Sequence, residues 1–460
     1  FSGRTVMIIL LLLLEIGLLF SVFSKLEQYL PIFYGSAILF TACMLFYVLN
    51  TRSNPSLKLS WCIVIALFPF FGAVLYWIIH TDIGHKVVQR IDQENMKESA
   101  PFVLDQTELM ERLKEEEPAL YNVARYTTKF CGCPVYDNTH TVYYGDIQTA
   151  LENILKEIDR AEHFIFLEYF IVREGYMWGM ILHQLIEKAK AGVDVRLLYD
   201  GTCSFGSLPY NYPKKLEKHG IQCRVFSPIR PFISTHYNNR DHRKILVVDG
   251  KVGFTGGFNL SDEYINITQP HGRWKDAGIK LTGDGVRSLT MMFLQVWNST
   301  GRPSPYAPYL LEPHRTMIPS KGYVIPYGDT PLDQENVGEM IYLDILNRAK
   351  EYVYIMTPYL ILDNEMVTAL TFAAKRGIDV RLILPHIPDK KYVYILAQSH
   401  YPQLLAAGVR IFEYTPGFVH AKVFLSDDNC ASVGTINLDY RSLYLHFECS
   451  AYLYKTEAIP

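Results

Sequence analysis

The chain has 460 residues, enough for two or three domains, and 49% of them are hydrophobic. Its formal net charge is −3, so it lacks the basic excess that a dedicated nucleic-acid-binding protein usually carries. The eight cysteines include no C-x-x-C pair and no spacing typical of a zinc site, and unpaired cysteines favour a reducing compartment.

Three apolar stretches come first, at 6–23, 30–49 and 60–79. A membrane-spanning helix needs about 20 apolar residues, and each stretch comes close to that length. A cleaved secretion signal is disfavoured because two more apolar segments follow at once, and buried core helices are disfavoured because the stretches are apolar all round. We therefore predict a transmembrane region over 1–80 and a multi-pass protein of the cell membrane.

The orientation of this region does not follow from the flanking charges. Arg4, Arg52 and Lys58 flank one side of three spans, and three basic residues flank the other, so the positive-inside rule favours neither. The unpaired cysteines favour a cytoplasmic location for the rest of the chain. A polar segment at 81–135 follows and is typical of a connector, with a charged run at 108–117 that suits a solvated helix.

Beyond the connector the chain repeats itself. AGVDVRLLYDG at 191–201 corresponds to RGIDVRLILP at 376–385, and HGIQCRVF at 219–226 corresponds to AGVRIF at 407–412. The offsets are nearly constant, at 185 (377 − 192) and 188 (408 − 220) for the shared glycines. Such agreement predicts a duplicated domain, with halves at 136–320 and 321–460.

Each half alternates amphipathic helices with short apolar strands. The predicted helices are 147–158, 181–189, 338–349 and 367–375, and the predicted strands are 164–171, 193–199, 353–361 and 378–384. This alternation indicates an α/β fold with a largely parallel sheet in each half, the two halves being related by a pseudo-two-fold axis.

The same polar motif occurs once in each half. The first copy has His242, Lys244 and Asp249 followed by GGFN ending at Asn259, and the second has His420, Lys422 and Asp427 followed by GTIN ending at Asn437. The histidine precedes the asparagine by 17 residues in both copies (259 − 242 and 437 − 420). One such motif alone would be a weak signal, but two copies with the same continuation indicate a functional site.

The spacing of the motif has a chemical consequence. Residues i and i+2 of a strand point to one face, so each histidine projects beside its lysine, and the glycine-rich turn brings an asparagine amide to the same place. Two such faces together form a pocket with two imidazoles and two ammonium groups, which suits a phosphodiester anion. Imidazole is about half protonated near neutral pH, so one ring can attack while the other donates a proton.

The chain resembles the phospholipase D superfamily, whose members carry two such motifs, and within it the bacterial cardiolipin synthases. The resemblance rests on the two motifs, on Trp61 with the segment 69–72, on RWKD at 273–276 and on GTINLDYRS at 434–442. It implies two phospholipase D-like α/β/α halves preceded by transmembrane helices.

The resemblance also implies roles for individual residues. His242 would be the nucleophile that forms a phosphohistidine, and His420 would be the general acid for the leaving alcohol and then the base for the incoming one. Lys244, Lys422, Asn259 and Asn437 would hold the phosphoryl oxygens. A downstream carboxylate would orient each histidine, Asp276 in the first copy and Glu448 in the second. Asp249 and Asp427 belong to the catalytic motif, but we expect them to support the strand. Neither a metal ion nor a cofactor is required.

The implied reaction transfers a phosphatidyl group between two phosphatidylglycerol molecules and gives cardiolipin and glycerol. The alternatives are transfer to another alcohol, lipid hydrolysis, nucleic-acid cleavage, or a non-catalytic membrane scaffold. The apolar stretches and the lack of basic excess disfavour a nucleic-acid partner, and the two complete motifs disfavour a scaffold. The expected partners are therefore phosphatidylglycerol and cardiolipin, and the sequence leaves a homo-oligomer open.

Overall fold

The computed structural model describes residues 10, 13–17, 20–21, 30–51, 55–80, 83–228, 238–310, 317–333 and 335–459. These residues form two compact units, whose boundary falls within α5 (Ile83–Ser99), between Val88 and Gln89. The larger unit runs from Gln89 to Pro228 and continues from Asn238.

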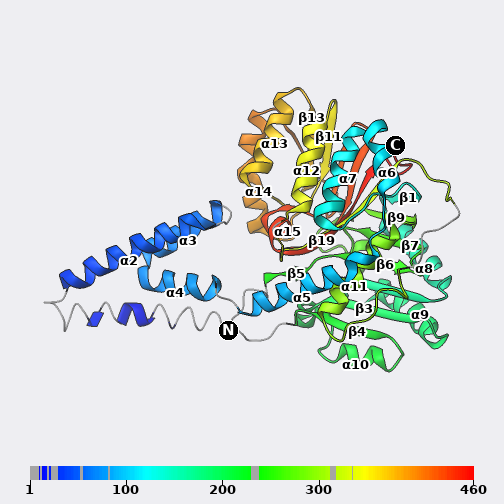
Figure 1. Cartoon of the computed structure of the whole chain (residues 1–460), viewed down its shortest axis with the longest axis horizontal. Helices are drawn as coiled ribbons and strands as arrows, with labels where there is room; N and C mark the ends of the chain where they lie inside the picture. Colours follow the sequence, from blue (N-terminus) through cyan, green and yellow to red (C-terminus); the bar gives the residue numbers. More distant parts are fainter. Residues whose placement is uncertain are drawn as a thin grey trace. The chain divides into compact units, whose positions relative to one another are not determined.

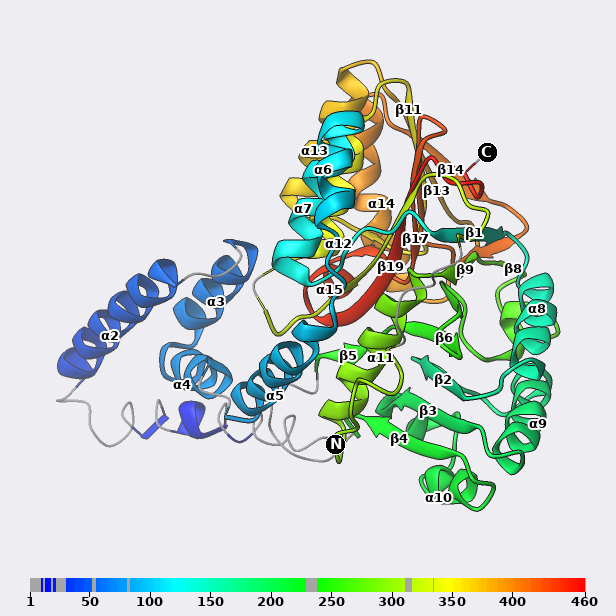
Figure 2. The same ribbon diagram turned by 45° about the vertical axis from the view of Figure 1, so that its right-hand side comes forward.

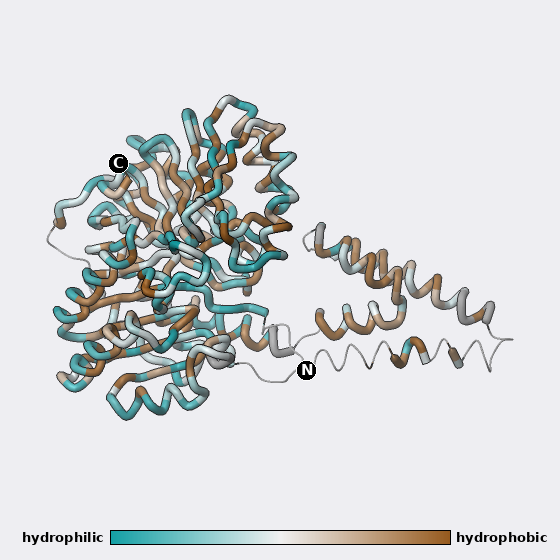
Figure 3. Tube along the Cα trace, turned by 180° about the vertical axis from the view of Figure 1, so that it is seen from behind, coloured by the Kyte–Doolittle hydropathy of each residue, from teal (hydrophilic) through white to brown (hydrophobic). Residues whose placement is uncertain are grey.

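The smaller unit contains α2 (Leu30–Asn50), α3 (Pro55–Leu67) and α4 (Pro69–His80) (Figure 1). Val48, Ile65 and Tyr76, one from each helix, form a small buried core. Gly72 lets α4 approach α3 closely, because a Cβ atom there would lie 2.8 Å from the Cα of Ile65. The three helices are largely hydrophobic along their length (Figure 3).

The apolar stretch at 60–79 is divided between two helices, so it does not form the single continuous helix expected there. The helix ends before Phe68 and a new one begins at Pro69, whose ring and missing N–H favour the first position of a helix over its interior. The stretch at 30–49 forms α2, and 6–23 lies largely outside the described residues. Among the residues described, no helix combines the length and the apolar character that crossing a membrane requires.

The larger unit contains two sheets with the same strand order. The first follows β1-β9-β7-β6-β2-β3-β4, and the second follows β10-β19-β17-β16-β11-β13-β14. The strands of the first are β1 (Thr139–Tyr144), β2 (Phe164–Tyr169), β3 (Asp194–Asp200), β4 (Gln222–Phe226), β6 (Lys244–Val248), β7 (Val252–Gly256) and β9 (Gly278–Gly283). Those of the second are β10 (Tyr323–Asp329), β11 (Tyr352–Met356), β13 (Asp379–Pro385), β14 (Arg410–Tyr414), β16 (Val423–Ser426), β17 (Cys430–Gly434) and β19 (His446–Tyr454). The predicted duplication is confirmed.

Both sheets are mixed, so the prediction of a largely parallel sheet is wrong. Along these two strand orders, only β2, β3 and β4, and their counterparts β11, β13 and β14, pair in parallel, and the other neighbours are antiparallel. The cause is a tight hairpin after each motif. Asp249 and Gly250 have φ of 52° and 64°, and Asp427 and Asp428 have φ of 51° and 50°, the left-handed pair that turns a chain directly back.

Helices cover the sheets as the amphipathic spacing predicts. In the first half, α8 (Ile147–Asp159) and α9 (Tyr176–Lys190) lie on one face of the sheet and α11 (Val286–Ser299) lies on the other (Figure 2). The remaining helices of this half and the next are α10 (Tyr212–Glu217), α12 (Val337–Arg348), α13 (Asn364–Lys375), α14 (Lys391–Ala406) and α15 (Tyr440–Tyr444). The predicted strand 353–361 is split into β11 and β12 (Leu360–Ile361).

The segment expected to be a connector is built into the larger unit from Gln89 onward. It forms most of α5, then α6 (Thr107–Glu116) and α7 (Pro118–Cys131). Its side chains bond to distant parts of the unit: Gln89 Nε2 donates to Leu332 O at 2.7 Å, and Tyr126 Oη donates to Glu335 at 2.9 Å. These contacts tie 89–131 to the catalytic halves, which a flexible linker would not do.

Two very short strands cross from one half to the other. β5 (Arg240–Asp241) pairs in parallel with the first residues of β19, and β15 (Gly417–Val419) pairs in parallel with β8 (Arg273–Lys275). Each crossing strand immediately precedes a motif histidine, so the crossings place both motifs between the halves.

Candidate active site

Each motif histidine is fixed by its backbone to a strand of the opposite half. The His242 N–H donates to Phe447 O at 2.9 Å, and the His420 N–H donates to Lys275 O at 2.7 Å. The next residue along each of those strands is a carboxylate, Glu448 or Asp276. The crossing strands therefore deliver one acid to each imidazole.

The carboxylates are exchanged between the halves. Nδ1 of His242 lies 2.9 Å from both carboxylate oxygens of Glu448, and Nδ1 of His420 lies 2.7 Å from Oδ2 of Asp276. The resemblance to the phospholipase D superfamily pairs each acid with the histidine of its own copy, and this pairing is wrong. Its physical reason is the parallel pairing of β5 with β19 and of β15 with β8, which carries each histidine out of its own half.

Glu448 is held rigidly by three donors. Besides His242, it accepts hydrogen bonds from the Thr435 hydroxyl and, at 2.5 Å, from the Ser442 hydroxyl. Burial raises the pKa of Glu448, but the favourable interactions with His242 and His446 outweigh it and hold that pKa below its usual value. Asp276 is likewise buried and keeps a lowered pKa through His420 and Lys422. Both acids are therefore ionised at neutral pH.

The carboxylates decide which nitrogen of each ring carries the proton. An ionised acid only accepts, so Nδ1 of each ring donates to it, and the Nε2 lone pair remains for chemistry. Lys422 Nζ also lies 2.9 Å from Nδ1 of His420, but Nδ1–H has no lone pair to offer, and this ammonium donates to the carbonyl of His420 instead. Lys244 Nζ similarly donates to the carbonyl of His242 at 2.5 Å.

Burial lowers the pKa of all four basic groups. It holds the pKa of His242 well below its ordinary value despite the nearby Glu448, and burial together with Lys422 lowers the pKa of His420 to about 4. Burial also lowers the pKa of Lys244 to about 8 and that of Lys422 to about 7, against the attraction of the carboxylates. Both imidazoles are therefore neutral before substrate binds, whereas the sequence-based expectation has them near half protonation.

The two motif asparagines are placed differently. Asn259 is engaged at both ends, because its Oδ1 accepts from the Ile171 N–H at 3.0 Å and its Nδ2 donates to Tyr264 Oη at 2.6 Å. Asn437 is buried, and its Oδ1 has no hydrogen-bond partner within the described part of the chain. Asn437 thus has polar capacity left for a ligand, while Asn259 braces the loop around Tyr264.

The motif aspartates lie at the far end of their strands. Asp249 accepts from the N–H groups of Glu162, His163 and Phe164, each at 2.8 Å. Asp427 accepts from those of Lys350, Glu351 and Tyr352, at 2.8, 3.0 and 2.9 Å. Each aspartate lies five positions after its lysine, about 16 Å along an extended chain. The expectation that they support the strand is confirmed.

Aromatic rings enclose the histidines, and none of these rings was predicted from the sequence to belong to the site. Around His242 these are Phe170 and His446, with ring centroids 4.9 and 5.4 Å away. Around His420 they are Tyr264 and Trp274, both at 5.4 Å. His446 could have been predicted from the sequence, because it precedes Glu448 by two residues in a strand and so lies on the same face.

Arg243, between the histidine and lysine of the first motif, bridges the halves. It is buried, and its guanidinium donates to the backbone carbonyls of Glu448, Met292 and Asp329 at 3.2, 3.4 and 3.4 Å. Because one of these carbonyls belongs to Glu448 itself, Arg243 helps to position the acid that holds His242.

Two groups in the described part of the chain place metal-ligand atoms within 4.8 Å of one another: His242 with His446 and Glu448, and Glu339 with Asp363 and Glu365. In the first group, Glu448 already accepts from three donors. In the second, Tyr444 Oη contacts both Glu339, at 2.9 Å, and Asp363. Hydrogen bonds thus hold Glu448 in the first group, and Glu339 and Asp363 in the second.

The family described as cardiolipin synthase, phospholipase D-like domain, matches residues 154–269 and 342–459. The family described as phospholipase D-nuclease N-terminal matches 39–79. A cardiolipin synthase of Alkalihalophilus pseudofirmus is 35% identical over 94% of this chain and 85% of its own length, and one of Halalkalibacterium halodurans is 34% identical over 88% and 81%. An uncharacterized protein of Streptococcus mutans is 50% identical over 90% and 89%.

A similar fold occurs in the phosphatidylserine synthase of Haemophilus influenzae, with a TM-score of 0.56 and 14% identity over 75% of this chain and 87% of that one. A duplicated mixed sheet whose two motifs share one buried site places the chain among the phospholipase D-like proteins. Within that class, the two matched segments and the relatives that align along most of their length show that the chain belongs to the cardiolipin synthase family.

Proposed function

We propose that this protein transfers a phosphatidyl group from one phosphatidylglycerol to the glycerol hydroxyl of a second, giving cardiolipin and free glycerol. The observation that carries the proposal is the pair of buried imidazoles, each held at Nδ1 by a carboxylate of the opposite half, with two buried lysines beside them. Family membership supports the choice of a phospholipid substrate.

In the first step, Nε2 of His242 attacks the phosphorus of the donor lipid. The nitrogen–phosphorus bond forms as the bond from phosphorus to the glycerol headgroup breaks, and Nε2 of His420 gives its proton to the departing glycerol oxygen. The ammonium groups of Lys244 and Lys422 stabilise the charge on the phosphoryl oxygens, usually a large contribution to catalysis. Covalent catalysis divides one difficult displacement into two easier ones.

His420 must carry a proton before it can act as an acid. Its pKa is about 4 in the empty site, mainly because of burial and then because of Lys422. A bound phosphodiester adds a negative charge near the ring, which favours the imidazolium and raises that pKa. The substrate therefore brings about the protonation that its own cleavage requires.

In the second step, the glycerol hydroxyl of another phosphatidylglycerol attacks the phosphohistidine. His420 accepts the hydroxyl proton, the new phosphorus–oxygen bond forms, and the bond to His242 breaks. One phosphodiester replaces another, so the overall exchange is nearly isoenergetic and needs no nucleotide. A buried site at a membrane favours the alcohol over water, because it excludes water and holds the second lipid nearby.

The hydrophobic helices α2–α4 support membrane association, and the unpaired cysteines support a cytoplasmic location of the catalytic unit. Asn437 would orient the phosphate by donating from its Nδ2, because phosphate oxygens only accept, and Asn259 would fix the surrounding loop. Nucleic acid has no part in this reaction.

The test is product analysis with purified protein in vesicles of phosphatidylglycerol alone. We expect cardiolipin and glycerol in equal amounts, and the reverse reaction when glycerol is in large excess. Phosphatidic acid as the main product would make the enzyme a hydrolase. Cardiolipin formed only after addition of a nucleotide-activated lipid would show that the donor is different.

A further inference from the structure

Helix α14 carries exposed apolar side chains on one side and lines a pocket on the other. Tyr392, Ile395 and Leu396 are 66%, 65% and 48% exposed. Their spacing of i, i+3 and i+4 places them on one helix face. The same face becomes polar at Ser399 and Gln403, so the apolar surface is confined to the first half of the helix. Ile387, in the loop before α14, is also exposed.

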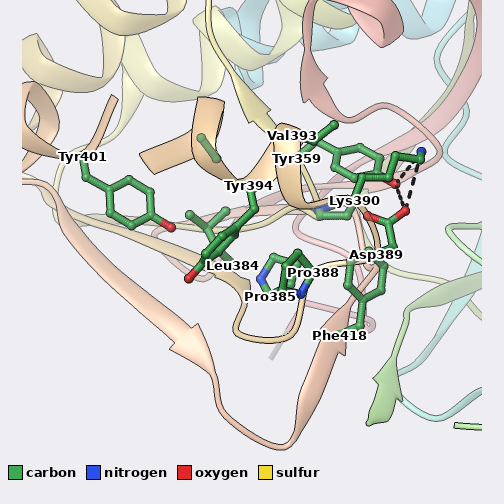
Figure 4. Close-up of a pocket in the computed structure, with 12 residues that line it drawn as sticks. Tyr359, Leu384, Pro385, Pro388, Asp389, Lys390, Val393, Tyr394, Tyr401 and Phe418 are labelled. Carbon is green, nitrogen blue, oxygen red and sulfur yellow. Dashed lines mark hydrogen bonds and ion pairs between the residues drawn. The ribbon is translucent and has the colours of Figure 1, made fainter. Parts of the chain in front are cut away.

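The inner side of the same turns faces a pocket next to the proposed active site. Val393, Tyr394 and Ala397 line it together with Tyr359 and Phe418 (Figure 4). The Phe418 ring lies 6.0 Å from His420 and 4.7 Å from Trp274, which is itself a neighbour of His420. One turn of α14 thus connects an exposed apolar surface with the surroundings of the acid–base histidine.

The charges at this end of α14 favour an anionic surface. Asp389 accepts from Tyr359 Oη at 2.6 Å, and Glu413 accepts from Tyr394 Oη at 2.6 Å, so both nearby acids are engaged within the protein. Lys390 reaches Tyr359 Oη at 3.4 Å and pairs with Asp389 at 3.6 Å, and its side chain remains half exposed, so Lys391 is the main positive charge on this face. Lys391 is exposed and forms no ion pair among the described residues. An apolar face edged by lysines is the combination that binds membranes containing anionic lipids.

We propose that the first half of α14, with Ile387, docks on the surface of an anionic lipid bilayer and brings the His420 side of the active site to the membrane. This inference rests on the proposed function, because a lipid substrate is what such docking would supply. Tyr392, Ile395 and Leu396 enter the interfacial region, and Lys391 lies at the level of the phosphates. A soluble substrate would gain nothing from this contact.

The direct test uses the full chain reconstituted in phosphatidylglycerol vesicles, with a photo-crosslinking benzoylphenylalanine in place of Ile395. The matched control carries the same group in place of Phe372, an exposed apolar residue of α13. We expect lipid adducts at 395 in several-fold excess over 372, measured by mass spectrometry of the intact protein. Equal labelling at both positions would overturn the proposal, and so would crosslinking at 395 to a second copy of the chain.

Kinetics give an independent test. Replacing both residues, I395S with L396S, should raise the apparent KM for phosphatidylglycerol vesicles about tenfold, since each buried aliphatic group contributes a sizeable part of interfacial binding. The rate on short-chain phosphatidylglycerol, kept below its micelle-forming concentration, should stay within about twofold. Phe372→Ser should change neither value. An equal loss on both substrates would show that the surface supports the fold and does not dock.

The charge is tested with Lys391→Gln. Binding to anionic vesicles should weaken about fivefold, the value of one surface lysine, and binding to zwitterionic vesicles should be unchanged. Equal weakening on both would contradict the role of charge. Crosslinking does not depend on turnover, so the two proposals can fail separately. Lipid adducts at 395 without any cardiolipin would refute the proposed reaction and leave the docking surface standing.

Discussion

Because each histidine pairs with the carboxylate of the opposite half, we predict different effects for the two carboxylate-to-amide variants. Pairing within each half would predict the opposite effects. Glu448→Gln should impair the nucleophile His242 and block formation of the phosphohistidine. Asp276→Asn should impair His420, which acts in both steps, so the phosphohistidine still forms, though more slowly, and then breaks down slowly. After a single turnover with lipid, an adduct on His242 should therefore accumulate in Asp276→Asn and be absent in Glu448→Gln.

The size of the effect follows from the contacts. Glu448 holds Nδ1 of His242 at 2.9 Å from both of its oxygens, and loss of a charged hydrogen bond costs about 1.5–3 kcal/mol, or about 10- to 150-fold in rate. An amide N–H facing Nδ1 also favours the tautomer whose Nε2 carries the proton and cannot attack. The comparable carboxylate-to-amide change in a serine protease triad lowers turnover about 10⁴-fold, so we expect a fall of about 10³- to 10⁴-fold.

The assay is rapid quenching on short-chain phosphatidylglycerol followed by mass spectrometry of the intact protein. Glu413→Gln is the matched control, because Glu413 lies 2.9 Å from Nδ1 of His386 in a second histidine–glutamate pair outside the site. It should retain the wild-type rate on this soluble substrate. An adduct that accumulates in Glu448→Gln and not in Asp276→Asn would refute either the crossed pairing or the assignment of roles to the two histidines.

Three further outcomes are expected. Asp249→Ala should lower the free energy of unfolding by about 2–3 kcal/mol, because it leaves three backbone N–H groups without their acceptor, while the rate per folded molecule stays within about twofold. Thermal melts and active-site titration would check this, and a rate loss without destabilisation would contradict it. The lysines are charged below their pKa values, about 7 for Lys422 and about 8 for Lys244, so kcat/KM on a soluble substrate should fall as pH rises through this range. Lys422→Arg, which stays charged, should move that fall to the pKa of Lys244, and an unchanged pH profile would exclude Lys422 as its source. Activity should persist in excess chelator because the lysines supply the positive charge, and loss restored by one divalent ion would disprove this.

The sequence predicted those features of the site that depend on neighbouring residues. Lys244 begins β6, and the two-residue period of a strand correctly placed each histidine beside its lysine. The hairpins behind the mixed sheets also had a local signal, since Asp249-Gly250 is a dipeptide typical of such turns. Pro69 and Gly72 also predicted a kinked or closely packed helix at 60–79, and the structure has a break between two helices there.

The crossed pairing depends on contacts between segments distant in the sequence. β5 has two residues and β15 has three, too few for any periodicity to be recognised. In the sequence, His242 lies 206 residues from Glu448, and His420 lies 144 residues from Asp276. Within each half, the downstream carboxylate is a sensible partner for its histidine. The arrangement of the two halves instead brings the carboxylate of the opposite half to each histidine.

The exchange also explains why both halves must be present for either motif to be stable. Lys244 and Lys422 are buried, and so are Glu448 and Asp276, so at a pH below the pKa of Lys422, about 7, the site with neutral imidazoles has two positive and two negative charges. An isolated first half would bury Lys244 and His242 without Glu448, and an uncompensated buried charge costs several kcal/mol. A phosphodiester adds one negative charge to this balanced site, and a proton on His420 restores the balance. The buried charges that stabilise the fold therefore also couple substrate binding to the protonation of His420.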